Sequence, residues 1–309
     1  MLLCFEHHRL VDVDALDDHP ATLLAQMKDE HEARVERLTA IQGEHRTLVV
    51  TMGANIGARK GAVGRDVLEA VLPRYPVEPV VDIELNRLSV QDGSDASWQA
   101  GQAEVSSRAA HVQELVVRHA LTHVSVFALA PIPLLMHLGL CLGDIVDVEP
   151  RQRRRQPPSW TWLPPNGAEQ AYELLCHRDP SGPALEVVLA VSVTGSVDVD
   201  VASHSAPAGA SVYELRVPQP MPDIVRCPEQ VADFRHAVRH ALTQIAKRFG
   251  GLVTVRVFPA LPNALAVAFG QALLPKADPR IVIYDMNAAR GGWVEALVLL
   301  PGPNGPRPC

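Results

Sequence analysis

The sequence has few aromatic residues and few cysteines. Phe, Trp and Tyr together make up 5% of the 309 residues. A core formed by this chain must therefore consist mainly of Val, Leu and Ala, and Val-rich runs such as 187–201 favour strands. The five cysteines are odd in number and never occur in a CxxC spacing. A disulfide framework is therefore not expected, and the pattern favours a reducing cytoplasm.

The chain also lacks two charge patterns that would reveal its partners. Its N-terminus has no cationic start and no long apolar stretch before Glu6, so we do not expect a secretion signal there. The net charge is −7, which argues against a protein that coats long DNA or RNA, because such binding depends on neutralising phosphates. A local basic site for a small anion is compatible with this charge.

The common catalytic motifs are missing as well. The loop GANIGARKG (53–61) lacks the Gly-Lys-Ser/Thr ending of a phosphate-binding P-loop and does not spell G-x-G-x-x-G. Residues 81–86 have the outline of a nuclease core but carry Asn86 where a Lys is required. No G-x-S-x-G elbow is present. We therefore expect no catalytic residues.

Two pairs of residues have the spacing of metal ligands. His236 and His240, and likewise His137 and Cys141, lie four residues apart on predicted helices. The first pair lacks the glutamate of an HExxH motif, and the second lies in an apolar run with no third ligand in view. We interpret them as a solvated helix face and as core, and expect neither a metal nor a cofactor.

Apolar periodicity and turn residues predict an α/β chain that begins with a helical arm. The predicted strands are 47–52, 77–85, 124–130, 185–193, 211–217, 253–258, 281–285 and 294–300. The predicted helices are 21–41, 61–72, 95–121, 228–249 and 263–273, with a further buried helix after Pro133. The first helix either packs on its own domain or docks a partner.

The chain contains an internal repeat at a shift of 131 residues. The string V-x-V-F-x-x-x-P-x7-G occurs twice, each time after a long predicted helix. It matches Val124, Val126, Phe127, Pro131 and Gly139 to Val255, Val257, Phe258, Pro262 and Gly270. The order of the elements around both copies indicates a duplication rather than a chance match.

The repeated string describes a buried strand, a sharp turn and a buried helix. Its prolines end the strand because they lack the N–H that a sheet requires, and they are tolerated at the start of a helix. The glycine allows the helix to lie close to a neighbouring element. Such a turn aims backbone N–H groups and a helix N-terminus at one point, at the carboxyl end of a strand, which is a geometry that binds anions.

One copy of the string lies in the longest uncharged run, VSVFALAPIPLLMHLGLCL (124–142). Its 19 residues are close to the length of a membrane span. Two prolines within three residues, one His, and Arg256 in the matching strand of the second copy argue against a span. We interpret the run as two core elements that follow each other directly.

Three stretches together resemble a SAVED domain, the sensor module of bacterial CBASS anti-phage systems and of some type III CRISPR systems. One is FALAPIPLLMHLGLCLGD (127–144), followed by an Arg-rich segment and Trp-x-Trp. The others are FPALPNALAVAFGQAL (258–273) with IVIYDMN (281–287), and the V-T-G at 193–195. The resemblance covers about residues 45–300, and its specificity lies in the ordered set rather than in one motif.

The resemblance implies an α/β fold of two fused Rossmann-like (CARF-like) lobes related by internal pseudo-duplication. We expect an N-terminal arm at 1–44, a first lobe at 45–163, a second lobe at 164–301 and a tail at 302–309. It also implies binding of a cyclic oligonucleotide, by analogy an oligoadenylate, between the lobes, followed by head-to-tail self-association that activates an effector. Relatives carry the effector on the same chain, so we expect either a separate effector protein or a truncated sequence. No membrane partner is expected.

The expected ligand-binding residues lie at the carboxyl ends of the strands and in the Arg-rich segment. They are Thr51, Gly53, Asn55, Pro131, Pro133, Leu134, Arg151, Arg153, Arg154, Arg155, Trp160, Thr194, Gly195, Ser196, Pro262, Asn263, Tyr284 and Asn287. In this interpretation the arginines capture phosphate and Trp160 or Trp162 stacks on a base. The alternative for the arginines is a solvated loop. Two other functions stay open: a ring nuclease on the same fold, and a structural subunit with an inactive pocket.

Overall fold

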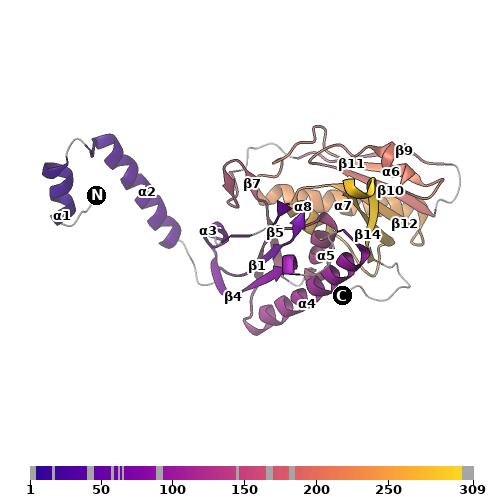
Figure 1. Cartoon of the computed structure of the whole chain (residues 1–309), viewed down its shortest axis with the longest axis horizontal. Helices are drawn as coiled ribbons and strands as arrows, with labels where there is room; N and C mark the ends of the chain where they lie inside the picture. Colours follow the sequence, from indigo (N-terminus) through magenta and orange to yellow (C-terminus); the bar gives the residue numbers. More distant parts are fainter. Residues whose placement is uncertain are drawn as a thin grey trace.

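The structure is a computed structural model of the whole chain. It describes residues 5–15, 18–39, 45–56, 59–61, 63–64, 66–87, 93–143, 146–164, 170–180 and 185–300. Two sheets with their helices form the body, and we refer to them as the first and second lobe (Figure 1).

The first lobe is built on a parallel sheet with the strand order β4-β1-β5-β6. Its helices α4 and α5 contribute to the same buried cluster as the apolar side chains on one face of this sheet. The elements are β1 (Arg46–Gly53), α3 (Val67–Ala70), β4 (Tyr75–Glu84), α4 (Asp95–Arg118), β5 (His123–Leu129), α5 (Ile132–Leu142) and β6 (Asp147–Arg151). Short paired strands complete it: β2 (Asn55–Ile56), β3 (Arg59–Lys60), β7 (Arg154–Arg155) and β8 (Pro158–Ser159).

The second lobe repeats this arrangement and adds a strand at each edge of its sheet. Its order is β14-β13-β12-β10-β11-β9, in which the four central strands are parallel and the outer two antiparallel. The elements are β9 (Glu173–Arg178), β10 (Glu186–Ser192), α6 (Val199–His204), β11 (Ser211–Arg216), α7 (Pro228–Phe249), β12 (Thr254–Ala260), α8 (Asn263–Gln271), β13 (Arg280–Asn287) and β14 (Gly292–Leu300).

The two lobes share one strand order, which confirms the two-lobed α/β fold expected from the sequence. The order β4-β1-β5-β6 corresponds to β11-β10-β12-β13, and in both lobes a long helix precedes the third strand and a short buried helix follows it. Because all eight strands are parallel within their sheets, the carboxyl ends of each set lie at one edge. The repeated sequence therefore corresponds to repeated structure.

The lobes meet where α5 and α8 pack together between the sheets (Figure 1). A Cβ atom built on Gly139 would lie 2.8 Å from the carbonyl carbon of Val267, and one built on Gly270 would lie 2.7 Å from the backbone nitrogen of Leu140. Neither distance is compatible with a side chain. The glycine of the repeat is thus required in both copies, because each helix contacts the backbone of the other.

The uncharged run 124–142 lies in this interface, as β5 and α5. Residues 133–142 of α5 are all buried, and both lobes contribute to one continuous apolar cluster around α5 and α8. Among the described residues, no helix is long and apolar enough to cross a membrane. His137 and Cys141 are 0% and 4% exposed, as expected for core residues.

Several predicted elements differ from the structure. The helix expected at 61–72 is reduced to α3, a single turn. The Val-rich run does not continue as strand beyond β10, because Asp198 caps α6 by accepting hydrogen bonds from the backbone nitrogens of Asp200 and Val201. β6 and β9 were not predicted.

The N-terminal arm stands apart from the two lobes (Figure 1). It consists of α1 (Phe5–Arg9), a π-helical turn (Leu10–Asp14) and α2 (Ala21–Thr39). Apolar side chains of α2 are exposed, including Met27 at 48% and Val35 at 42%. The expected helix at 21–41 is thus confirmed as far as residue 39, and residues 40 and 41 lie outside the described residues.

Candidate functional site

The carboxyl ends of the central strands are closed in the same way in both lobes. After β1, the backbone nitrogen of Ala54 donates to the carbonyl oxygen of Leu129 at the end of β5 (3.0 Å). After β10, the backbone nitrogen of Thr194 donates to the carbonyl oxygen of Ala260 at the end of β12 (2.9 Å). These bonds place the loops after the first strands beside the starts of α5 and α8. We call this edge of the two sheets the carboxyl edge.

The prolines of the repeat form the turns at this edge. Pro131 and Pro262 adopt extended ψ angles of 139° and 158°, and each is the residue that precedes a helix. Pro133 occupies the first turn of α5, where a missing N–H costs no helical hydrogen bond. Leu134 follows it and is buried.

The start of α8 connects the two lobes directly. The side-chain amide of Asn263 donates to the carbonyl oxygen of Ala128 in β5 (2.9 Å). The backbone nitrogen of Ala264 donates to the side-chain oxygen of Gln152, which follows β6 (3.1 Å). One donor of this helix N-terminus is therefore already used by the first lobe, and Asn263 fixes the position of the lobes.

On the first lobe, Thr51, Gly53 and Asn55 follow one another along the carboxyl edge. The hydroxyl of Thr51 donates to a side-chain oxygen of Asp82 in β4. A Cβ on Gly53 would lie 2.8 Å from the carbonyl oxygen of Gly61, so the backbone of the following loop packs against it. Asn55 is exposed, and is the residue of the three whose side chain is free to reach a ligand.

On the second lobe, Thr194, Gly195 and Ser196 form an open loop after β10. Ser196 is exposed, and no atom lies within 4 Å of the position that a Cβ on Gly195 would occupy. Two hydrogen bonds hold the loop in place: the Ser192 hydroxyl donates to Glu214 (2.6 Å) and accepts from the backbone nitrogen of Val197 (3.0 Å). A firmly held loop with open space above it is suited to contact a ligand.

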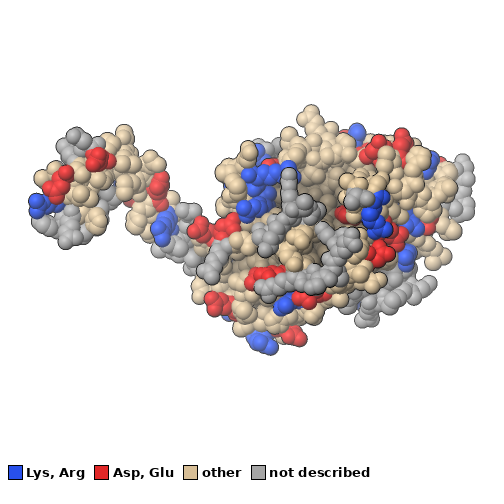
Figure 2. Space-filling model, viewed as in Figure 1, with Lys and Arg blue, Asp and Glu red and all other residues tan. Residues whose placement is uncertain are grey.

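The arginine cluster lies on the β7–β8 hairpin, where Figure 2 shows Lys and Arg side chains gathered. Arg153 forms an ion pair with Asp66 (3.2 Å), and its guanidinium lies over Trp160 at 5.5 Å from the ring. Arg154 is half-buried and Arg155 is exposed. Trp160 is 1% exposed and packs edge-on against Phe127 at 5.3 Å. Its ring therefore supports the hairpin and offers no open face to a base.

Two expected ligand residues, Tyr284 and Arg151, are buried and bound to partners within the protein. Tyr284 stacks on Phe258 (4.3 Å) in a cluster on the face of the second sheet that also contains residues of α6, and its hydroxyl accepts a hydrogen bond from Arg256 (2.9 Å). Burial raises the pKa of this hydroxyl. Arg151 is 7% exposed and is bound to Glu149. Asn287 ends β13 at the carboxyl edge and accepts from the backbone nitrogen of Arg290 (3.2 Å).

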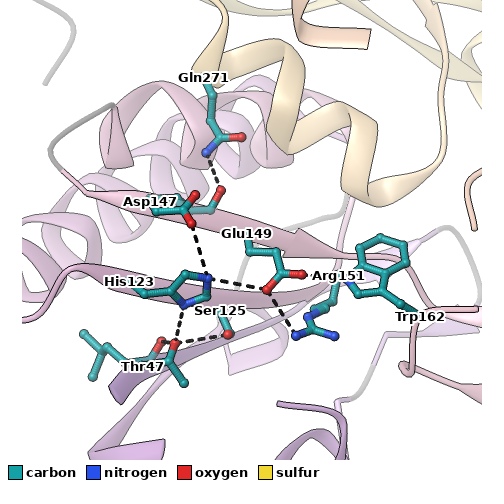
Figure 3. Close-up of polar contacts among 10 residues, drawn as sticks. Thr47, His123, Ser125, Asp147, Glu149, Arg151, Trp162 and Gln271 are labelled. Atoms are coloured by element: carbon teal, nitrogen blue, oxygen red, sulfur yellow. Dashed lines mark hydrogen bonds and ion pairs between the residues drawn. The ribbon is translucent and has the colours of Figure 1, made fainter. Parts of the chain in front are cut away.

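A buried polar network that the sequence did not reveal lies near the opposite end of the first sheet (Figure 3). Thr47 contacts His123 (2.8 Å) and Ser125 (3.1 Å) through its hydroxyl. Glu149 lies 3.4 Å from His123 and accepts from the indole nitrogen of Trp162 (2.7 Å). The signal was present in the strands, where polar residues alternate with Val at 123–126.

The charge of Glu149 is stabilised by this network. Burial alone would raise the pKa of its carboxyl, but the hydrogen bond from His123 and the charge of Arg151 outweigh it and lower the pKa to about 2. Gln152 is a second residue that the sequence did not single out, because the neighbouring arginines dominated the pattern. It is 8% exposed and joins the lobes through Ala264.

Two pairs of candidate metal ligands remain, one on α7 and one on α5. His236 and His240 are exposed on α7. Within the described ranges, no three His, Cys, Asp or Glu side chains lie together as metal ligands. His137 contacts the hydroxyl of Ser106 (2.8 Å), and burial lowers its pKa to about 4. It is therefore a neutral core residue at neutral pH.

Comparison with solved structures supports the two-lobed fold. The Acinetobacter baumannii Cap4 SAVED/CARF-domain containing receptor with the cyclic trinucleotide 3'3'3'-cAAA is similar at a TM-score of 0.54 and 12% identity, over 82% of this chain and 52% of that chain. The same receptor with 2'3'3'-cAAA gives a TM-score of 0.51 and 11% identity, over 82% and 51%. The chain thus spans about half the length of these receptors.

A sequence comparison identifies the family. The model of the SAVED family, described as "SMODS-associated and fused to various effectors sensor domain", matches residues 107–299. No curated protein matches the sequence. The match covers more than half of the chain and includes both copies of the repeated strand, proline turn and helix. The chain therefore belongs to the SAVED family of sensor domains.

Proposed function

We propose that this protein binds a cyclic oligonucleotide, most simply a cyclic oligoadenylate, at the carboxyl edge where its two lobes meet. The observation that carries the proposal is the pairing of two equivalent turns, Pro131 and Pro262, across the contact of α5 with α8. A ring of repeated phosphates and bases has several equivalent groups, so two equivalent half-sites suit it. The similar Cap4 structures contain cyclic trinucleotides.

The ligand-contacting groups in this proposal are the exposed or partly exposed residues of the edge. They are Asn55 from the first lobe, Gly195 and Ser196 from the second, and Arg154 and Arg155 from the β7–β8 hairpin. The arginines would neutralise phosphates, and the loops would contact the sugars and bases. The buried Trp160 and Tyr284 are not part of this contact set.

Ligand binding changes the assembly of the protein in this proposal. The protein acts in the cytoplasm as a sensor, and a ligand bound across both lobes fixes their relative position and favours head-to-tail self-association, which activates an effector. The family description, "fused to various effectors", supports an effector as the output. Analytical ultracentrifugation with and without cyclic triadenylate tests this step, and an unchanged sedimentation coefficient at saturating ligand would contradict it.

Binding is tested by isothermal titration with cyclic tri- and tetra-adenylate. Gly195→Asp places a carboxylate in open space at the carboxyl edge, and Gly251→Asp places one in equally open space before the amino-terminal end of β12. Repulsion between a carboxylate and a phosphate about 8 Å apart amounts to about 2 kcal/mol at an effective dielectric constant of about 20. We expect Gly195→Asp to weaken binding at least about tenfold, and Gly251→Asp to leave it unchanged.

Two outcomes would overturn the proposal. If neither ligand binds the native protein, it is not a sensor of these nucleotides. If the two glycine variants affect binding equally, the ligand does not bind at the carboxyl edge. Chromatography of the ligand after incubation identifies a ring nuclease, which would convert the ring to linear products.

A further inference from the structure

A cavity of about 380 Å³ lies along β6, over the polar network of the first lobe. Its walls come from the segments before β1 and β4, from β6, and from the first turns of α7 in the second lobe. The side chains that matter here are Arg74, Arg151, Arg235, His123, Trp162 and Pro228. Its volume is near the lower end of the range of small-molecule sites, roughly 300–1,000 Å³.

The cavity exists because the two lobes differ at this edge. In the second lobe, β14 pairs with β13 and covers it. In the described part of the first lobe, β6 pairs only with β5, and the chain continues into the β7–β8 hairpin instead. Trp162 returns past β6, and the backbone nitrogen of Leu163 bonds the carbonyl oxygen of Arg226 in the second lobe (2.9 Å). The segment that connects the lobes therefore forms a wall of the space beside β6. In the second lobe, the corresponding space is occupied by β14.

Positive charge in the cavity exceeds what its carboxylates neutralise. Three arginines line it, against Asp147 and Glu149. Glu149 is engaged by Arg151, His123 and Trp162, and the side chain of Asp147 is 67% exposed to solvent. Neither Arg74 nor Arg235 has a side-chain hydrogen bond or ion pair with a described residue.

Arg151 is the buried member of the three. Its guanidinium lies over Trp162 at 5.8 Å from the ring and bonds Glu149 at 3.1 Å, while its Nε has no partner among the described residues. Burial lowers the pKa of this guanidinium, and the charge of Arg74 lowers it further against the attraction of Glu149. Repulsion between Arg74 and Arg151 is relieved when an anion lies between them.

We propose that this cavity is a second ligand site, which takes an organic phosphate about the size of a mononucleotide. The phosphate lies among the arginines, because guanidinium groups match its geometry and charge. The remainder of the ligand lies against Trp162, Pro228 and the neighbouring Val231, which form an apolar wall. A ligand that joins an anion to a flat apolar group fits both walls at once.

The site shares no lining residue with the set proposed above to contact the cyclic oligonucleotide. Its lining follows β6 from Asp147, which pairs with His123 at the start of β5, to Arg151, which pairs with Phe127 two residues before the end of β5. Because α7 and β6 both contribute walls, an occupant contacts both lobes and stabilises their arrangement.

The test uses the whole chain and three probes: adenosine 5′-monophosphate, adenosine and inorganic phosphate. We expect saturable binding of the monophosphate, at least tenfold tighter than that of either fragment. Arg235→Gln should weaken it at least tenfold. Lys247→Gln removes one positive charge from an exposed position on the same helix and should leave it unchanged. Urea denaturation of each variant confirms that it is folded.

Several results would overturn the proposal: no saturable binding of the monophosphate, binding no tighter than that of phosphate alone, or equal effects of the two α7 variants. The two sites are distinguished by a crossed design. Arg235→Gln should spare cyclic oligoadenylate binding, and Gly195→Asp should spare monophosphate binding. Loss of monophosphate binding in Gly195→Asp alone would place that ligand at the carboxyl edge and contradict this inference.

Discussion

The contact between α5 and α8 makes a sharp prediction for Gly139→Ala. A Cβ at this position would lie 2.8 Å from the carbonyl carbon of Val267, closer still to its oxygen, and 3.1 Å from the backbone nitrogen of Gln271. The obstructing atoms are backbone, so no side-chain rotation relieves the clash. The helices must separate by at least about 1 Å to restore ordinary carbon contacts of about 3.5–4.0 Å, and the nearer carbonyl oxygen requires more.

The expected cost follows from two opposing effects. Overpacking of a tight core costs about 1–3 kcal/mol, and the rigid obstruction argues for the upper value. Alanine is favoured over glycine in a helix by about 1 kcal/mol. The free energy of unfolding should therefore fall by about 2 kcal/mol. Gly270→Ala should cost a similar amount, and the double variant less than the sum, because the same gap is opened once.

Urea denaturation of Gly139→Ala and of the matched control Gly101→Ala measures the effect. Gly101 lies inside α4, where the nearest atoms to an added Cβ belong to the Leu134 side chain, at 3.0 Å. The end of a leucine moves more readily than backbone, so we expect Gly101→Ala to be neutral or slightly stabilising. An unfolding free energy of Gly139→Ala within about 0.5 kcal/mol of the native value, at an unchanged denaturant slope, would refute the close contact of the lobes.

Three further predictions concern polar groups. The pKa of His137 is about 4 in the folded protein against an ordinary value of 6.5, so the unfolded state takes up its proton first and stability decreases as the pH falls through this window. By linkage, this histidine should cost the native protein about 2 kcal/mol of unfolding free energy between about pH 7.5 and about pH 5. In urea titrations, His137→Gln should lose that much less over the same range, and an unchanged pH dependence would contradict the burial of the imidazole. Asn263→Ala removes the hydrogen bond to Ala128 and should lower the unfolding free energy by about 1 kcal/mol; no loss would show that this bond does not hold the lobes. Glu149→Gln leaves Arg151 without its buried counter-charge and should cost about 3–5 kcal/mol, measured by thermal denaturation, and a variant as stable as the native protein would contradict the pairing.

The sequence predicted the structure best at prolines and glycines, where the residue type has one physical explanation. Pro131 and Pro262 form the turns two residues after their strands end, and the glycine eight residues later allows close packing of the helices. A helix that needs a glycine at the same place twice is best explained by two helices in mutual contact. The strand order of both lobes then follows from ordinary α/β connections.

What the sequence could not show was the direction in which side chains point. Trp160 follows an arginine cluster in the sequence, but its indole is inserted under the hairpin against Phe127. Tyr284 lies on a strand that ends at the carboxyl edge, yet it faces away from the first lobe. The apolar pattern of a strand predicts where the strand lies in the sequence. A polar residue within the strand faces one side of the sheet or the other, depending on the register. Arg151 was grouped with its neighbours for the same reason.

The most direct test of a site shared by both lobes is hydrogen–deuterium exchange with and without cyclic triadenylate. The ligand should slow exchange in four segments at once: residues 51–56 and 128–135 of the first lobe, and residues 193–197 and 260–266 of the second. Residues 254–257, at the amino-terminal end of β12, serve as the internal reference. Protection confined to one lobe, or none at saturating ligand, would contradict a cyclic oligonucleotide bound where the lobes meet.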